Sequence, residues 1–447
     1  MADPPPAALL LSCWKEFQSG QERLKTLDRA WRNDMEIMDR VRESGLPNNR
    51  LSHAYAGYIT AMASGYLLGE PVKYSVGDEG QADALKAVTD AYKDAQADAV
   101  DEELAEKASI YGRAVEIVYA DENAQPRCAA AETSAAFVVY DDTVAHKSLF
   151  GMHVTERRDV NNTMQGYDVH VYTQDKIYAY QTASLFGQLT NPVETPHYFG
   201  GVPMVEYWNN SSERGDFEPV LTDIGAYNIL QSDRVNEKEQ QVNGLLVITG
   251  ARIQNDEDGR TPAQQLREDK ILFLPDMQAK AEYLSQSGGA ETDKIVRDDL
   301  NADIHKFSLV PDMSDEKFSG NTSGVAIRYK LLGLEMLMRK KERWFRQALE
   351  ERMRLFAHFL AVKGGPTLNT RDVKMTFTRA LPANLLELSQ MVQNLSAMVP
   401  EMELLKQIPF VEDTEKAAAD MAAQRKEALK LQAEAFAVPR YEGGDDA

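Results

Sequence analysis

The residues that could support catalysis are spread along the chain without the spacing that a reaction centre needs. The sequence contains no Gly-rich phosphate-binding loop, no dinucleotide-binding fingerprint, no HExxH zinc motif and no GxSxG nucleophile motif. The histidines show no metal-ligand spacing, so we expect them to be structural or exposed: His53, His146, His153, His170, His197, His305 and His358. The sequence therefore predicts no catalytic residue, no metal site and no cofactor, although acidic residues distant in sequence can still meet in a fold.

Two acidic stretches are the remaining candidates for metal binding. The loop from Gln254 to Gln265 partly resembles a calcium-binding loop, but the two glutamines stand where carboxylate ligands are required. Asp141 and Asp142 are adjacent, and a single pair of this kind is more often part of a turn. We predict a plain turn at both places.

One long helix is predicted to organise the rest of the chain. Residues 324–363 carry one apolar stripe at the 3.6-residue period: Ile327, Leu331, Leu334, Met338, Phe345, Leu349, Phe356 and Leu360. Ser323 is a candidate N-cap, and Gly364-Gly365-Pro366 ends the pattern. An unbroken helix of this length would span about 60 Å. It suggests a central helix in a large assembly, and the alternative is a surface helix with a solvated charged face.

The composition is that of a globular protein with an unusual charge. The chain has 447 residues, of which 43% are hydrophobic and 27% charged, as expected for a soluble protein of several domains. The formal net charge is −21. This charge argues against binding nucleic acid over the whole surface, because such binding depends on Lys and Arg. It permits contact with DNA that must stay loose, and solubility alone is the alternative explanation.

Cysteine usage and the N-terminus bear on the compartment. The only two cysteines, Cys13 and Cys128, can form neither a disulfide framework nor a zinc site by themselves, which fits synthesis in a reducing cytoplasm. The first residues lack the basic region of a signal peptide. No apolar run approaches the roughly 20 residues that a membrane span requires, so we expect no membrane contact.

Helical and strand patterns together predict an α+β fold that is predominantly helical. Helices are expected at residues 20–45, 51–68, 80–110, 217–242, 291–307, 385–398, 401–408 and 414–436, besides the long helix. Strands are expected at residues 72–76, 114–119, 136–140, 151–155, 167–173, 176–180, 245–249, 270–274 and 373–378. Because no long helical crossover separates the runs between residues 111 and 209, we expect an antiparallel meander there.

Six blocks of sequence then occur in an order that is known from one family. The blocks are Pro47–Leu51 with Tyr55–Ile59 and Gly65–Val72; Val202–Asn210; Gly215–Glu218; Ala226–Asn228 with Ser232–Arg234; Gly320–Ala326; and Ile408–Asp413. Together they resemble the portal proteins, or head–tail connectors, of tailed bacteriophages of the siphophage type. The resemblance covers roughly residues 22 to 435.

The resemblance implies the portal fold, with wing, stem, clip and crown, assembled as a ring that usually has twelve subunits. Mapped onto this sequence, the parts are the wing at residues 1–215, the first stem helix at 216–243, the clip at 244–290, the second stem helix at 291–310, the tunnel loop at 311–323, a long wing helix and strand at 324–385, and a short crown with an acidic tail at 386–447.

The function implied by the resemblance is that of a channel and not of an enzyme. A portal ring sits at one capsid vertex of the virion after assembly in the host cytoplasm, and double-stranded DNA is packaged and ejected through it. Its implied partners are further copies of itself, terminase, the head–tail adaptor, and the major capsid and scaffolding proteins. Two alternatives remain from the residues alone: a nucleic-acid-processing enzyme of the packaging machinery, and a purely structural capsid scaffold.

Two groups of residues become candidate sites under this resemblance. The tunnel loop would line the DNA channel with Asp312, Asp315, Glu316, Lys317, Phe318 and Asn321. We expect Lys317 to guide phosphates while its acidic neighbours keep the contact weak, and an intersubunit salt bridge is the alternative. A basic stretch of the long helix would meet acidic faces of neighbouring subunits: Arg339, Lys340, Lys341, Arg343 and Arg346.

Overall fold

The structure is a computed structural model that describes residues 3–184, 186–242, 246–249, 261, 280–283, 290–313, 324–379, 385–396, 398–405, 408, 411 and 414–435. The chain divides into two compact units. The first comprises Met1–Asp315 with Lys330–Ala380, and the second comprises Glu316–Tyr329 with Leu381–Ala447. Helices and sheets occur together, which confirms the predicted α+β class.

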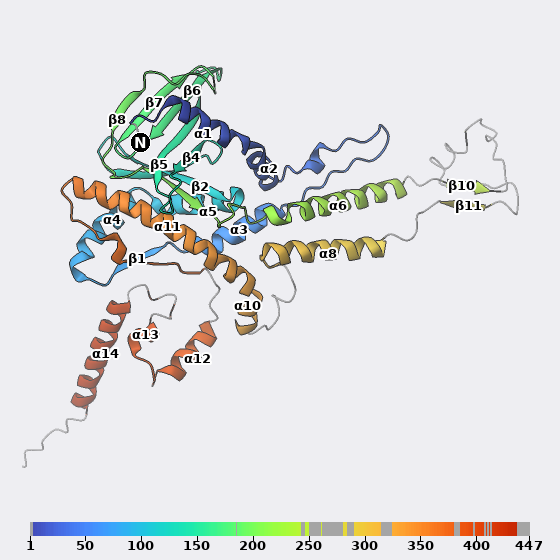
Figure 1. The fold of residues 1–447 in the computed structure, drawn as a ribbon. Coiled ribbons are helices and arrows are strands. Elements are labelled where there is room, and N and C mark those ends of the chain that lie inside the picture. The colour runs from blue at the N-terminus through green and yellow to red at the C-terminus, as the bar shows by residue number, and fades with distance from the viewer. Residues whose placement is uncertain are drawn as a thin grey trace, which may run out of the picture. The chain divides into compact units, whose positions relative to one another are not determined.

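A five-stranded antiparallel sheet follows the chain order, which confirms the predicted meander for the strands from residue 136 onward but not for the strand at 114–119 (Figure 1). Its strands are β4 (Ala136–Tyr140), β5 (Ser148–Arg158), β6 (Met164–Tyr172), β7 (Lys176–Thr182) and β8 (Val193–Pro196). Helix α1 (Ala7–Ser19), which the sequence patterns did not predict, packs on one face. Its Trp14 and Phe17 side chains lie against Phe137 of β4 and form an apolar core there.

A second, three-stranded antiparallel sheet carries the strand predicted at residues 114–119. Its order is β3 (Pro126–Ala131), β2 (Arg113–Ala120) and β9 (Met204–Trp208). A further apolar core joins Val115 and Met204 of this sheet to Val138 and Tyr172 of the five-stranded sheet. Gly151 on β5 leaves room for this contact, because a Cβ atom there would lie 2.3 Å from the Met204 sulfur.

After α1, the described chain of the first unit contains four helices before its three-stranded sheet. They are α2 (Gln21–Trp31), α3 (Tyr55–Leu68), α4 (Ala82–Asp94) and α5 (Ala97–Tyr111), with 3-10 turns η1 (Glu36–Asp39) and η2 (Glu79–Gln81). Two of the helices predicted in this region differ from the structure: one ends early and one is divided in two. The helix expected at 20–45 ends at Trp31. Asn33 then adopts a φ of 62°, and the backbone N–H of Asp34 donates to the Arg29 carbonyl, as in a Schellman motif. The helix expected at 80–110 divides at Gln96, whose φ is 53°.

The long helix is also divided. The structure has α10 (Gly324–Lys330) and α11 (Leu332–Val362), with a turn at Leu331, so the expectation of one unbroken helix was wrong. Gly333, a poor helix former, lies just beyond the break. After α11 and the 3-10 turn η4 (Thr370–Asp372), strand β12 (Val373–Thr376) pairs antiparallel with β1 (Lys73–Val76).

Two further helices of the first unit lie side by side (Figure 1). The 3-10 turn η3 (Glu218–Val220) leads into α6 (Leu221–Val242), and the chain returns through α8 (Ala290–Ser308). Between them in sequence, β10 (Leu246–Thr249) matches the strand predicted at 245–249 and pairs with β11 (Lys280–Tyr283), which was not predicted. The strand predicted at 270–274 lies outside the described residues.

The second unit contains most of α10 together with α12 (Leu385–Leu395), α13 (Glu401–Leu405) and α14 (Thr414–Ala435). These positions confirm the three C-terminal helices that the sequence predicted. Helix α13 packs against α14, and Leu404 and Leu405 are buried.

Candidate functional site

The helix pair α6–α8 is the feature of the first unit that several other segments of the chain contact through buried and hydrogen-bonded side chains. The turn η3 begins α6 with Pro219 in its first positions, where the missing N–H has no helical partner to lose. Ile224 of α6 and Ile304 of α8 are fully buried. Each helix therefore buries one apolar side and leaves much of its remaining surface exposed.

An extended segment, residues 49–53, lies along α6 and is held by polar side chains. Because three side chains of α6 lie four residues apart, they form a row on one side of the helix. Every second N–H of the segment donates to this row, and we call these three bonds the α6 ladder. The bonds run from the N–H groups of Asn49, Leu51 and His53 to the side-chain oxygens of Asn236, Ser232 and Asn228, at 2.7, 2.9 and 2.9 Å respectively.

The α6 ladder brings two of the sequence blocks into contact. The block Pro47–Leu51 and the block Ser232–Arg234 meet at the ladder. Next to it, Asp233 accepts hydrogen bonds from Arg40 and Arg42, which fixes the preceding loop to the same helix.

An aromatic cluster joins α3 to both helices of the pair. Tyr55 of α3 makes an edge contact with Tyr227 of α6 at 5.1 Å between ring centroids. Its hydroxyl donates to the Asn301 side chain of α8 at 2.6 Å. The Tyr55 ring also lies 5.9 Å from His305. Burial, followed by the neighbouring Tyr227, raises the pKa of Tyr55, so the hydroxyl stays protonated and can donate.

The chain that follows α8 is tied down by Tyr58 of α3. The Tyr58 hydroxyl donates to the Pro311 carbonyl at 2.7 Å and accepts from the Met313 N–H at 3.0 Å. A second bond links the His305 ring nitrogen Nδ1 to the Val310 carbonyl at 2.9 Å. The start of the predicted tunnel loop is therefore held against α3.

Of the predicted channel residues, the structure places only Asp312. Its carboxylate lies 3.9 Å from the His305 Nε2 atom, and its side chain is half-buried. The other predicted channel residues lie outside the described part of the chain: Asp315, Glu316, Lys317, Phe318 and Asn321.

The start of the helix pair is fixed by a buried ion pair with α11. Lys341 is 3% exposed, and its ammonium group contacts the carboxylate of Asp216, two residues before η3. Asp216 also accepts hydrogen bonds from the Ser109 hydroxyl at 2.6 Å and the Asn209 amide at 2.9 Å. Four segments of the chain thus meet at one carboxylate: α11, α5, the residues after β9 and the approach to α6.

A second buried ionic group lies further along α11. Arg352 is 0% exposed and donates two bonds to Asp101 of α5, at 2.6 and 3.0 Å, and one to Glu116 of β2 at 3.1 Å. Tyr207 of β9 donates to Glu116 at 2.7 Å, and the guanidinium lies 4.9 Å from the Tyr92 ring of α4. Burial raises the pKa of Asp101 to about 6 although Arg352 opposes the shift.

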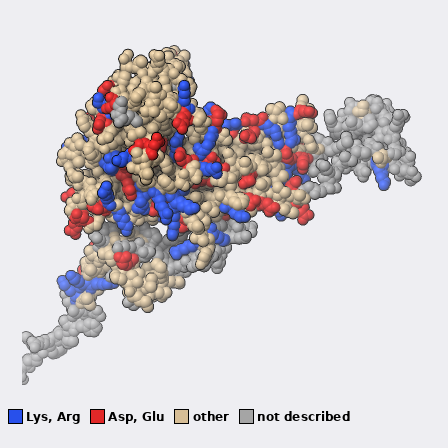
Figure 2. Space-filling view, in the orientation of Figure 1, with Lys and Arg blue, Asp and Glu red and all other residues tan. Residues whose placement is uncertain are grey.

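The predicted basic stretch of α11 does not act as one surface. Lys and Arg side chains gather over α11 in Figure 2, but Lys341 is buried and used within the chain. Arg346 is partly buried and donates to Glu342 and to the Met375 carbonyl. Arg339 is exposed and contacts Glu335 on its own helix, while Lys340 and Arg343 are exposed and make no ion pair within the described residues.

The histidines and acidic residues show no arrangement for catalysis in the part of the chain that the structure describes. No three His, Cys, Asp or Glu side chains come together there so as to hold a metal ion. Asp141 accepts bonds from the backbone of Thr143 and Lys147, which confirms the predicted turn. The turn predicted between Gln254 and Gln265 lies outside the described residues, except for Thr261. Across the described ranges, no helix is both long and apolar enough to span a bilayer.

We did not predict from the sequence that Lys341 and Arg352 of α11 are buried, although the pattern of apolar residues contained a signal for both. The apolar stripe advances by steps of three or four residues, except from Met338 to Phe345 and from Leu349 to Phe356. Each gap spans seven residues, and Lys341 and Arg352 fill these two gaps on the buried side. In this helix, the basic residues at the two vacant positions of the apolar stripe are the ones that form buried ion pairs.

Comparison with known proteins identifies the class to which this fold belongs. Over residues 10–431, the chain matches a profile of phage portal proteins. The chain belongs to this class and, within it, to the family described as phage portal protein, SPP1 Gp6-like. This confirms the resemblance on which the sequence blocks were interpreted.

Two relatives show the extent of the likeness. The chain is 24% identical to the portal protein of Bacillus phage SPP1 over 425 residues, covering 89% of this chain and 80% of that protein. It is 25% identical to the portal protein of Clostridium phage phiCD119 over 267 residues, covering 57% of this chain and 56% of that protein. The second match thus spans about half the length of that relative.

Proposed function

We propose that about twelve copies of this chain form a ring at one vertex of a phage capsid and that double-stranded DNA enters and leaves through the axial channel. The ring docks the terminase motor during packaging and the head–tail adaptor afterwards. It also contacts the major capsid and scaffolding proteins, and it assembles in the host cytoplasm. The chain acts as a structural conduit and carries out no reaction of its own.

In this proposal, α6 and α8 are the two stem helices. Residues 244–290 form the clip, residues 311–323 the tunnel loop, and residues 386–447 the crown. The observation that carries the assignment is the way the helix pair is held at the body of the first unit. Asp216 and Lys341 fix the approach to α6, and Tyr58 fixes the chain where it leaves α8 at Pro311. A loop that starts at Pro311 therefore begins from a rigid base and can project into a channel.

The charge of the chain fits a conduit that must not hold its cargo. A lumen rich in Arg and Lys would neutralise many phosphates at once and retain the DNA. A net charge of −21 per chain avoids such retention of the DNA, and a few basic side chains can still guide the duplex. We assign the guiding role to Lys317 and the moderation of its contact to Asp312, Asp315 and Glu316. The alternative role for Lys317 is a salt bridge between subunits.

We propose that α11 contacts neighbouring subunits through fewer of its basic residues than the sequence suggested. Lys341 and Arg346 are engaged inside the chain, so their charges are not presented to a neighbour. Lys340 and Arg343 are exposed, make no ion pair within the described residues, and remain available to acidic faces of adjacent copies. Arg339 is exposed as well, but it already pairs with Glu335 on its own helix.

Electron microscopy of the purified full-length chain tests the assembly. Rings with a central hole wide enough for a duplex are expected, and particles without a hole would favour the scaffold alternative. The guiding role is tested by Lys317→Glu in a packaging assay, with Lys86→Glu as the control at an exposed position of α4. We expect shorter packaged DNA for Lys317→Glu only, and unchanged length would remove the guiding role.

A further inference from the structure

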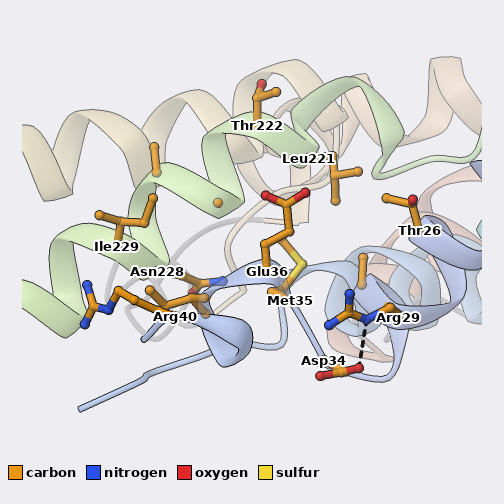
Figure 3. A pocket seen from close by; sticks show the side chains of 14 residues that line it. Thr26, Arg29, Asp34, Met35, Glu36, Arg40, Leu221, Thr222, Asn228 and Ile229 are labelled. Carbon is orange, nitrogen blue, oxygen red and sulfur yellow. Dashed lines mark hydrogen bonds and ion pairs between the residues drawn. The ribbon is translucent and has the colours of Figure 1, made fainter. Parts of the chain in front are cut away.

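A cleft of about 650 Å³ lies between α6 and the chain from α2 to η1 (Figure 3). Its apolar wall is formed by Ala30, Met35, Ile37, Leu221 and Ile229. The Glu36 side chain extends across the opening toward α6, as Figure 3 shows. Glu36 is exposed and makes no ion pair within the described residues. Arg29, Asp34 and Arg40 also line the cleft, but Arg29 pairs with Asp34 and Arg40 with Asp233. The cleft thus combines an apolar wall with one carboxylate, that of Glu36, which has no ion pair within the described residues.

This cleft lies on the side of α6 that faces away from α8. Ile224 and Tyr227 are on the buried side, where Tyr227 contacts the Tyr55 ring that also bonds to α8. Thr222, Gly225 and Ile229, which line the cleft, are about half a turn away by helical spacing. Helix α8 of the same chain therefore cannot fill the cleft.

Helix α8 carries an apolar stripe that its own chain does not cover. Val296 and Phe307 are 43% and 55% exposed, and Leu300 between them is partly exposed. The spacing of four and seven residues places all three on one side of the helix. Lys306 lies beside this stripe, with its ammonium group 5.1 Å from the Phe307 ring. Like Glu36, it makes no ion pair within the part of the chain described here.

The cleft and the stripe lie at matching heights along the helix pair. Tyr55 contacts Tyr227 of α6 and Asn301 of α8, so these two residues are at one level. The helices run in opposite directions, because the chain goes out along α6 and returns along α8. Residues 221–229 of α6 are therefore level with roughly residues 299–307 of α8, since both helices advance about 1.5 Å per residue.

We propose that the cleft is the docking site for the Leu300–Phe307 part of α8 from a second copy of this chain. The inference rests on the proposed ring, in which neighbouring copies stand at equal height, and it names the surfaces that meet. Phe307 fills the apolar hollow of the neighbour, and Lys306 pairs with Glu36 at its mouth. Each copy has one cleft and one stripe, so the contact is head-to-tail and can repeat until the ring closes.

Cross-linking tests which surfaces meet. The Thr222→Cys, Asp303→Cys double variant places one thiol in the cleft and one beside the stripe, within about one helical turn of the same level. With a short bifunctional maleimide, assembled rings of this variant should give a series of covalent multimers on a denaturing gel. A mixture of the two single variants should give dimers at most, and each single variant should give none. The parent chain is the background control, because its Cys128 is buried and its Cys13 partly so.

Charge exchange tests the polar contact independently. Glu36→Lys and Lys306→Glu should each lower the yield of rings several-fold, and the combination should restore much of it. Glu122→Lys, at an exposed turn position away from the cleft, is the matched control and should leave the yield unchanged.

The outcomes separate this inference from the proposed function. If the parent chain forms rings but the double-cysteine variant forms rings without intermolecular cross-links, the docking inference fails and the portal function stands. Cross-linking by a single variant above the parent background would also overturn it, because the introduced thiol would then meet its own counterpart or Cys13, and the proposed contact places neither of them there. If the parent chain forms no ring, the proposed function fails and the docking inference fails with it.

Discussion

The ammonium group of Lys341 on α11 contacts the carboxylate of Asp216 in the interior of the first unit. Both side chains are almost completely buried, and Asp216 receives two further hydrogen bonds from Ser109 and Asn209. Because Asp216 lies two residues before η3, this one contact connects the body of the unit to the start of the helix pair. The contact therefore ties α11 to the approach to α6.

Replacement of Lys341 by Met should destabilise the chain strongly. The change leaves Asp216 buried without its counter-charge, and such a loss costs about 3–5 kcal/mol. Urea denaturation of the monomer measures the free energy of unfolding. The double variant Lys341→Met, Asp216→Asn should recover part of the loss, because the buried charge is then absent. Lys340→Met, on the exposed side, should change stability by about 0.5 kcal/mol or less.

Replacement of Arg352 tests the second buried group. Arg352→Met leaves Asp101 and Glu116 in the core without a cation, so we expect a loss of about 3–5 kcal/mol in the free energy of unfolding. Arg352→Lys should not restore stability, because an ammonium group cannot reproduce the two-pronged contact with Asp101. The comparison is Arg354→Met, whose partly exposed pair with Glu351 should be worth about 1 kcal/mol or less. Equal effects of the Arg352→Met and Arg354→Met variants would contradict the assignment.

Removal of one acceptor tests the α6 ladder. Ser232→Ala leaves the Leu51 N–H without its acceptor, which should cost about 1–3 kcal/mol. Hydrogen exchange should show faster exchange of the Leu51 amide than in the parent chain. Ser211→Ala, at an exposed position with no hydrogen bond within the described residues, should leave both stability and exchange unaltered.

Tyr58→Phe should loosen the start of the proposed tunnel loop. The variant keeps the ring but loses the hydroxyl that joins Pro311 and Met313. We expect faster amide exchange at Met313 and a loss of about 1 kcal/mol. Tyr180→Phe is the matched control, since the Tyr180 hydroxyl makes no hydrogen bond in the described ranges. An unchanged Met313 exchange rate would show that the loop is held by other contacts.

The five-stranded sheet should lose stability in mild acid because of His153. Burial, with a smaller contribution from His170 on the adjacent strand, lowers the pKa of His153 below its usual value of 6.5. The unfolded chain therefore takes up a proton at a higher pH than the folded chain. The stability due to neutral His153 is present above pH 6.5 and is lost as the pH falls below it.

The measurement is the free energy of unfolding between pH 7.5 and about pH 5, in the parent chain and in His153→Gln. The variant should show a smaller decrease over this range, because it lacks the group that titrates. His358→Gln, at an exposed position, should reproduce the slope of the parent. Parallel slopes for all three chains would rule out His153 as the source of the pH dependence.

Local patterns predicted most elements of this fold, because each depends on neighbours in sequence. The strands between residues 111 and 209 are bounded by turn residues, and their antiparallel order follows from the short connections. The missed ends have local causes too, since Asn33 and Gln96 adopt left-handed conformations at positions where the sequence has no Gly or Pro to indicate a break. Helix α1 was not predicted, because its apolar run Ala7–Leu11 is short and Pro6 offers no side chain to cap its start.

Contacts between distant segments could not be predicted in the same way. Arg352 and Asp101 are 251 residues apart in sequence, and no local pattern indicates that they meet. The gaps in the apolar stripe of α11 marked Lys341 and Arg352 as unusual without naming their partners. The blocks shared with portal proteins include segments of the α6 ladder, but these segments are far apart in sequence and meet only in the folded chain.

The α6 ladder also has a length limit that follows from the geometry of its two members. Two residues of extended chain advance about 6.6 Å, whereas four residues of helix advance about 6.0 Å. The two repeats drift apart by about 0.6 Å per rung, so a fourth or fifth rung would fall out of register. Because of this mismatch, the backbone N–H groups of the segment and the side chains of the helix stay in register for only a few rungs. The mismatch thereby limits how far the segment can follow the helix.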